Sequence, residues 1–99
     1  MKLREIAYAR SGDKGDVSNI CVFPYDDADW ERVRDSVTVD AVRNLFGDLV
    51  KGDITRYELP SMHGLNFVMT EALSGGVSMS LRTDAHGKSY GSLILALEV

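Results

Sequence analysis

The 99-residue sequence contains one cysteine, two prolines and two histidines, and these scarcities exclude several classes of protein. With Cys21 alone, no disulfide can form within the chain, and a reducing cytoplasm is the expected environment. One cysteine and two distant histidines are too few for an ordinary zinc site. No apolar stretch approaches the length that spans a bilayer, and the charged residues 1–6 lack the apolar region of a signal peptide. We therefore expect a cytoplasmic protein without a membrane partner.

Clustered positive charge is also missing. The net charge is -4, and the 11 Lys and Arg residues are scattered among 15 Asp and Glu residues. A domain that binds nucleic acid normally carries a basic stripe, so we expect no nucleic-acid partner. The length and the hydrophobic fraction of 44% are those of one globular domain, and we assign residues 1–99 to it.

Apolar periodicity in the first half of the chain predicts three strands and two helices. The strands are expected at 3–9, 19–23 and 53–59, and the second, apolar throughout, is expected in the centre of a sheet with both faces covered. One helix begins near Asp29. Another is capped by Thr38 and ends at Gly47, and its apolar residues share one face: Val39, Val42, Leu45 and Phe46.

The second half of the chain is less regular. Residues 65–73 predict a short helix that ends at Gly75 and Gly76, residues 77–83 predict a strand, and residues 84–87 a turn. The last run, 92–99, suits a strand or a buried helix equally well. Strands with helices on one side of the sheet indicate an α+β architecture.

The polar run from Arg10 to Asn19 is the most unusual segment, and we interpret it as a loop between two strands. Its glycines, one of which we expect at positive φ, could shape an anion-binding turn, and its two cations could hold a phosphate or carboxylate. Alternatively, its acids cap their own backbone amides and pair with those cations. A Gly→Ala change here is expected to cost about 1 kcal/mol. The candidate ligand or interface residues are Arg10, Ser11, Gly12, Asp13, Lys14, Gly15, Asp16 and Asn19.

Other chemistry-bearing residues are isolated. His63 could act as a general acid or base, although a lone loop histidine is more often polar surface. Cys21 lies in an apolar run and is interpreted as a small core residue. No catalytic triad can be assembled, the oxygen ligands match no calcium loop, and no metal or cofactor is expected. The secondary candidates are His63, Asn66, Gly75, Gly76 and Arg82.

Several ordered blocks resemble the small C-terminal domain of the acyclic terpene utilization protein AtuA family. Residues 9–20 are similar to that domain's opening, approximately A-R-S-G-D-K-G-D-x-x-N-I. The later blocks follow in the same order, and the match extends from about Leu3 to Val99: they are residues 56–60, 65–68, 72–76, 80–84 and 87–88.

This resemblance implies a ferredoxin-like α+β fold, a two-layer sandwich with helices on one face of the sheet. Typical members carry a much larger domain before this one, which this sequence lacks, so the resemblance implies a separate large subunit. The family is associated with catabolism of acyclic terpenes through acyl-CoA intermediates, and it supplies no established catalytic residue for this domain.

Three functions are therefore open. The chain is an accessory subunit that docks an AtuA-like large subunit, an enzyme or enzyme fragment of hydratase or lyase type, or a homo-oligomeric structural domain. In the first two readings, an acyl-CoA or carboxylate compound is the expected ligand.

Overall fold

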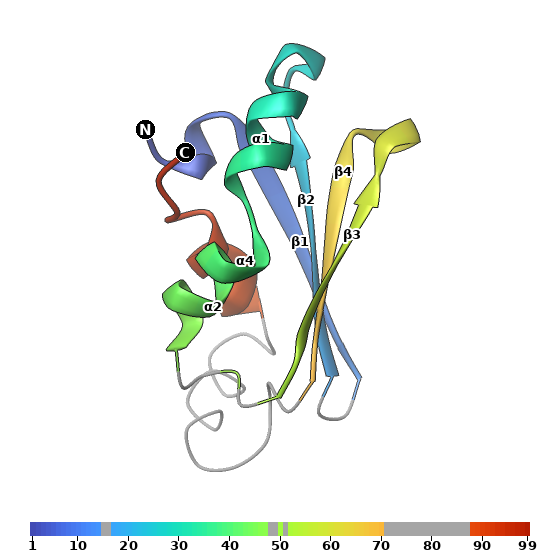
Figure 1. Cartoon of the computed structure of the whole chain (residues 1–99), viewed down its shortest axis with the longest axis vertical. Helices are drawn as coiled ribbons and strands as arrows, with labels where there is room; N and C mark the ends of the chain where they lie inside the picture. Colours follow the sequence, from blue (N-terminus) through green and yellow to red (C-terminus); the bar gives the residue numbers. More distant parts are fainter. Residues whose placement is uncertain (15–16, 48–49, 51, 71–87) are drawn as a thin grey trace.

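A four-stranded antiparallel sheet forms one layer of the molecule (Figure 1). The computed structural model describes residues 1–14, 17–47, 50, 52–70 and 88–99. The strands lie side by side in the order β1-β2-β4-β3. Their bounds are β1, Ala7–Lys14; β2, Val17–Pro24; β3, Ile54–Leu59; and β4, Gly64–Met69.

The helices form the second layer, on one face of the sheet (Figure 1). They are α1 (Trp30–Ser36), α2 (Val39–Phe46) and α4 (Lys88–Ile94), and short 3-10 helices cover Leu3–Glu5, Asp27–Asp29 and Pro60–Met62. This arrangement confirms the predicted two-layer α+β sandwich. None of the helices in the described residues is long and apolar enough to span a membrane.

In the described chain, a β-hairpin is followed by helices, and this hairpin-then-helix pattern occurs twice. If α1 and α2 count as one connection, the order is ββα-ββα. Moving β1 to the end of that order gives β-α-β-β-α-β, which is the ferredoxin-like order of elements. The strand order in the sheet is therefore the ferredoxin-like one, although the chain begins at a different strand.

The core lies between the two layers. The residues of β2 and β4 that face the helices are fully buried: Ile20, Val22, Leu65, Phe67 and Met69. Val33 of α1, Val42 of α2 and Ile94 of α4 close over them, also fully buried. Thr38 caps α2 as predicted, because its Oγ1 accepts a hydrogen bond from the Ala41 amide at 3.1 Å. Gly47 ends that helix with a positive φ of 54°, although its ψ of -125° lies outside the left-handed helical region.

Three predicted elements are wrong in type or bounds. A helix was expected over residues 65–73, but residues 64–69 form strand β4, in which buried and half-buried side chains alternate from Leu65 onward. The strand predicted at 3–9 starts only at Ala7, because Leu3 and Arg4 donate their amide hydrogens to Leu97 and Leu95. Residues 92–99, expected as either a strand or a helix, are neither over their whole length. Helix α4 ends at Ile94, and an isolated bridge joins Lys2 to Glu98. The elements predicted over 71–87 lie outside the described residues.

Two smaller predictions also need correction. Asp29 stands at the start of α1 without a capping hydrogen bond, whereas Asp26 caps the preceding turn by accepting from the Ala28 amide at 2.9 Å. The second predicted strand, β2, is central as expected, but only one of its faces is covered. Ile20 and Val22 are buried, whereas the alternate residues Cys21 and Phe23 are only half-buried. Cys21 is therefore not a core residue.

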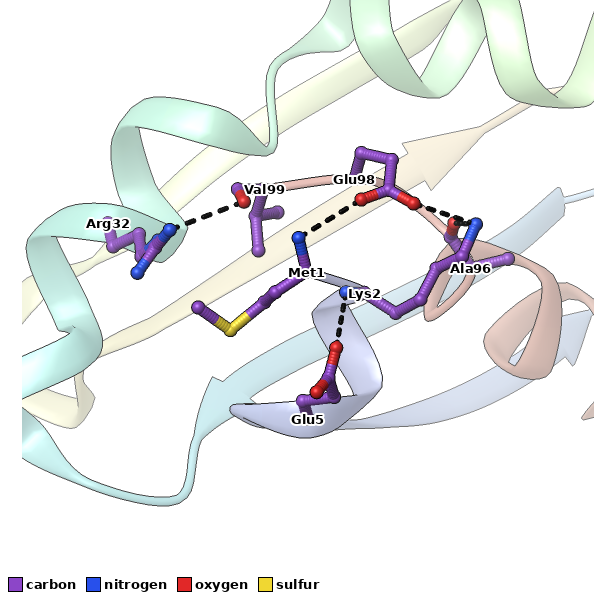
Figure 2. Close-up of polar contacts among 7 residues, drawn as sticks. All are labelled: Met1, Lys2, Glu5, Arg32, Ala96, Glu98 and Val99. Carbon is purple, nitrogen blue, oxygen red and sulfur yellow. Dashed lines mark hydrogen bonds and ion pairs between the residues drawn. The ribbon is translucent and has the colours of Figure 1, made fainter.

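The two ends of the chain are joined by polar contacts (Figure 2). The Glu98 carboxylate lies 3.1 Å from the Met1 amine and 3.0 Å from Lys2 Nζ. Arg32 of α1 donates to the Val99 carbonyl oxygen at 3.4 Å. The hydrogen bond from Lys2, followed by that from the N-terminal amine, lowers the pKa of Glu98 below its ordinary value.

Because folding lowers this pKa, the ionised Glu98 stabilises the fold at pH values above about 4.5, the ordinary pKa of this carboxyl group. That stabilisation is lost as the pH falls through the lowered pKa. We expect Glu98→Gln to unfold at lower denaturant concentration than wild type at about pH 7, by a small margin because the group is exposed. The two proteins should converge in acid, below the lowered pKa of Glu98. Urea titrations at both pH values provide the measurement, and a gap that persists in acid would contradict the assignment.

Candidate functional site on the open face of the sheet

The polar run is a β-hairpin rather than a loop. Residues 10–14 belong to β1 and residues 17–19 to β2, and Arg10 pairs with Cys21, Gly12 with Asn19 and Lys14 with Val17. Only positions 15 and 16 separate the two strands in sequence. The composition of the run is typical of a loop, but continuous pairing with apolar β2 holds it extended. Gly12 accordingly has no positive φ, and Gly15, the other glycine at which a positive φ is expected, lies outside the described residues.

Strand alternation divides the candidate residues between the two faces of the sheet. Ser11 pairs with fully buried Ile20 and so lies on the helix side, where α4 passes so close that a Cβ at Gly91 would collide with the Ser11 hydroxyl. Arg10 and Gly12 lie on the opposite side. The predicted set is therefore not one continuous site.

We call the sheet surface that faces away from the helices the open face. No described helix lies on it (Figure 1). No carboxylate is among its described residues, although the chain has 15 Asp and Glu residues. By register, its described residues are Tyr8, Arg10, Gly12, Val17, Asn19, Cys21, Phe23, Thr55, Tyr57, Leu59, Gly64, Asn66 and Val68.

Two asparagines and a cysteine make contact near the middle of the open face. Asn19 Nδ2 lies 3.5 Å from Asn66 Oδ1 and 3.9 Å from Cys21 Sγ, and Cys21 Sγ lies 3.6 Å from Asn66 Oδ1. Arg10 stands directly across from Cys21 in the ladder. The structure thus brings together three predicted residues, Arg10, Asn19 and Asn66, with Cys21, whose place the sequence interpretation missed.

Burial of the cysteine favours its neutral form. Burial raises the pKa of the Cys21 thiol, and this effect exceeds the lowering by the Asn19 hydrogen bond and the Arg10 charge. The thiol is therefore protonated at neutral pH and a poor nucleophile. The cluster offers hydrogen bonds and one positive charge. The described residues place no general base beside it.

Arg10 is the charged residue of this face whose surroundings the structure describes. Its side chain is exposed, and no ion pair or hydrogen bond joins it to another described residue. A guanidinium with free donors recognises carboxylates and phosphates. The face can therefore accept one anionic group within otherwise uncharged surroundings.

Aromatic rings cover the end of the open face near the tip of β2. The Tyr8 ring centroid lies 5.5 Å from that of Phe23 and 5.3 Å from that of Tyr25. The Phe23 ring rests on Gly64, where an added Cβ would come within 2.5 Å of Phe23 Cε1. Sequence reasoning missed this cluster. The alternation of side chains along each strand could have revealed it, because Tyr8 lies two positions from Arg10 and Phe23 two positions from Cys21, all on one face.

His63 belongs to a different part of the structure. It follows Pro60–Met62 with φ 51°, and its Nδ1 lies 2.8 Å from Asp27 Oδ1. Its ring stacks on Trp30 with the centroids 5.7 Å apart. These contacts tie the β3–β4 turn to the start of α1, which favours a structural role.

The remaining candidates cannot be placed. Gly15, Asp16, Gly75, Gly76 and Arg82 lie outside the described residues, and for Asp13 and Lys14 only the backbone is described. Within the described part of the chain, no group of three or more His, Cys, Asp or Glu side chains could hold a metal ion. A cavity of about 430 Å³ lies between β1 and α4, lined by Ala9, Arg10, Ser11, Gly91, Ser92 and Leu95.

Four antiparallel strands covered on one face by helices define a ferredoxin-like α+β domain. The model of one family, the AtuA ferredoxin-like domain, matches residues 1–99, and the chain belongs to that family. No curated protein and no solved structure matches the chain.

Two glycines of the open face should respond differently to substitution. Gly64→Ala forces a Cβ into the Phe23 ring and should lower the free energy of unfolding by about 1–3 kcal/mol. Gly12→Ala has no φ strain and meets only the movable Asn19 amide, at 2.9 Å. It should change stability by less than about 0.5 kcal/mol, against the cost predicted for a loop glycine. Urea denaturation of both variants is the measurement, and equal losses would contradict this packing.

The raised pKa of Cys21 predicts slow alkylation. We expect iodoacetamide to react with the folded protein only as the pH rises above the range of an ordinary thiol, and with the urea-unfolded protein at lower pH. Replacement of Arg10 by Gln should raise the apparent pKa further, because the guanidinium favours the thiolate. Mass spectrometry of the labelled fraction against pH gives both values. Equal profiles for the folded and unfolded protein would contradict the assigned environment.

Proposed function

We propose that this chain is an accessory domain that docks an AtuA-like large protein through the open face. In this role it helps to complete an activity on an acyl-CoA or carboxylate compound of acyclic terpene catabolism. The observation that carries the proposal is a sheet face on which no described helix lies and whose described side chains are mostly aromatic, aliphatic and amide groups, with one arginine.

The composition of the open face supports a protein partner. The cores of protein interfaces are depleted in charged residues and enriched in Tyr, Phe and Arg. The described part of the open face has Tyr8, Phe23 and Tyr57, a single arginine and no carboxylate. Tyr57 remains 52% exposed, so it has area left to bury in a complex.

Arg10 supplies the electrostatic part of this recognition. The Arg10 guanidinium, beside the uncharged residues described on this face, favours a partner surface, or a ligand held at the junction, that places a carboxylate opposite it. Because the position is surrounded by apolar and amide groups, docking would remove water from the ion pair and strengthen it. Lys14 ends the same strand, and its contribution to this contact remains a prediction.

The enzyme alternative has less support. Catalysis would require a positioned base or nucleophile, whereas the Cys21 thiol is held protonated and His63 is engaged by Asp27 and Trp30. Recognition groups without a reactive group among the described residues suit a domain that completes another protein's site.

A matched pair of Asn→Lys variants tests the docking surface. Asn66 lies in the middle of the open face, and Asn44 is exposed on α2 in the opposite layer. We expect Asn66→Lys to weaken binding to a purified AtuA-like large protein at least tenfold, about 1.4 kcal/mol, since it buries an unpaired charge. Asn44→Lys should bind like wild type.

Isothermal titration gives the affinities, and circular dichroism on the same samples shows that each variant is folded. Weakening by Asn44→Lys alone would move docking to the helix layer. If the wild-type chain binds no AtuA-like large protein, docking itself is refuted, and the enzyme and homo-oligomer alternatives gain support.

A further inference from the structure

The helix layer covers the inner side of β1 unevenly. Side chains alternate along a strand, and those that face the helices belong to Ala7, Ala9 and Ser11. Ala7 is 1% exposed and belongs to the core, whereas Ala9 and Ser11 are only half-buried. Helix α4 packs against this strand (Figure 1), and the cavity of about 430 Å³ lies between them. The space beside Ala9 and Ser11 is therefore accessible to a small molecule.

Helix α4 approaches β1 closely at Gly91, which is buried. A Cβ at this position would collide with the Ser11 hydroxyl and would lie 3.8 Å from Ala9 Cβ. The Leu95 amide donates to the Gly91 carbonyl oxygen at 3.4 Å, so the helical turn continues past Gly91. Gly91, Ser92 and Leu95 line the cavity from this turn, and Ala9 and Ser11 line it from the strand.

Two hydroxyl groups at the cavity have no partner in the described part of the chain. Among the described residues, the Ser and Thr hydroxyls that take part in hydrogen bonds are those of Ser18, Thr38 and Thr70. Ser11 and Ser92 line the cavity and do not belong to that set. Each of these two hydroxyls can therefore donate a hydrogen bond to an oxygen atom of a ligand.

Arg10 is the charged residue among those described around the cavity. Since β1 is an edge strand, no neighbouring strand separates Arg10 from the cavity. A guanidinium binds a carboxylate through two parallel hydrogen bonds. A carboxylate carries one negative charge, whereas a phosphate monoester carries about -1.5 to -2 at neutral pH. The one described cation therefore matches a carboxylate better than a phosphate.

We propose that the cavity between β1 and α4 binds a small carboxylate with a short apolar chain. Arg10 binds the carboxylate group, and the hydroxyls of Ser11 and Ser92 donate to its oxygens. The apolar chain lies against Ala9 and Leu95, and the surface that it covers is removed from water. The cavity is large enough, since small-molecule sites in proteins occupy about 300–1,000 Å³. This site belongs to one chain alone, so it goes beyond docking at the open face.

Titration of the ¹⁵N-labelled chain with hexanoate, followed by NMR, tests the site. We expect a Kd below about 1 mM and the largest shift changes at the amides of Gly91, Ser92 and Leu95. Hexan-1-ol lacks the charge and inorganic phosphate lacks the apolar chain, so each should bind at least tenfold more weakly. Phosphate that binds as tightly as hexanoate would overturn the ligand class. No binding of hexanoate, or shift changes confined to other residues, would overturn the site.

A matched pair of Arg→Gln variants tests the role of Arg10. Both arginines are exposed, but Arg10 lines the cavity and Arg32 lies on α1. Arg10→Gln should raise the Kd for hexanoate at least tenfold, whereas Arg32→Gln should leave it unchanged. Equal Kd values for the two variants would refute the part assigned to Arg10.

A carboxylate placed in the cavity provides a second variant. Ser92 is exposed, so Ser92→Glu should fold, and its negative charge should repel hexanoate and raise the Kd at least tenfold. An unchanged Kd in a folded Ser92→Glu variant would place the ligand elsewhere. Because these titrations use the chain alone, their failure is distinguishable from a failure to dock a large protein.

Discussion

The pairing of β2 with β4 is the interaction on which the rest of the structure depends. It aligns Ile20 with Phe67 and Val22 with Leu65, and all four side chains are fully buried beneath the helices. Burying side chains of this size stabilises a fold by about 1.5–3 kcal/mol each. Because these strands are the inner two, each supports one edge strand, and the loss of this central pair would separate the two hairpins.

The same alternation that builds the core also exposes the second face. Each inward residue of β2 and β4 is followed by an outward one, so the contact among Asn19, Cys21 and Asn66 results directly from the burial of Ile20 and Phe67. All described helices lie on one side of the sheet, and the polar cluster and aromatic rings remain accessible on the other. The docking proposed here would therefore use a sheet face, on which pairing with Cys21 fixes the place of Arg10 in the ladder.

Much of this fold could be predicted from the sequence, because local signals determine it. The Thr38 cap, the helical spacing of Val42 and Phe46, and the apolar run of β2 gave correct elements. The β4 strand could not be separated from a helix by periodicity, since a short apolar run suits both. The segment from Arg10 to Asn19 has the composition of a loop, and only pairing with β2, a tertiary effect, makes it strand. Of the open face, the sequence interpretation named Arg10, Gly12, Asn19 and Asn66 as separate candidates, and only the strand register joins them to Cys21 and the aromatic rings in one surface.

The most direct test of the open face as the docking surface is cross-saturation between the methyl-labelled chain and an AtuA-like large protein. Val68 lies on the open face and Val33 is fully buried between sheet and helices. Saturation of the large protein should attenuate the methyl signals of Val68 and Leu59 and spare those of Val33 and of Leu45 on α2. Attenuation at Leu45 with Val68 unaffected would contradict the assignment of the open face and place the partner on the helix layer.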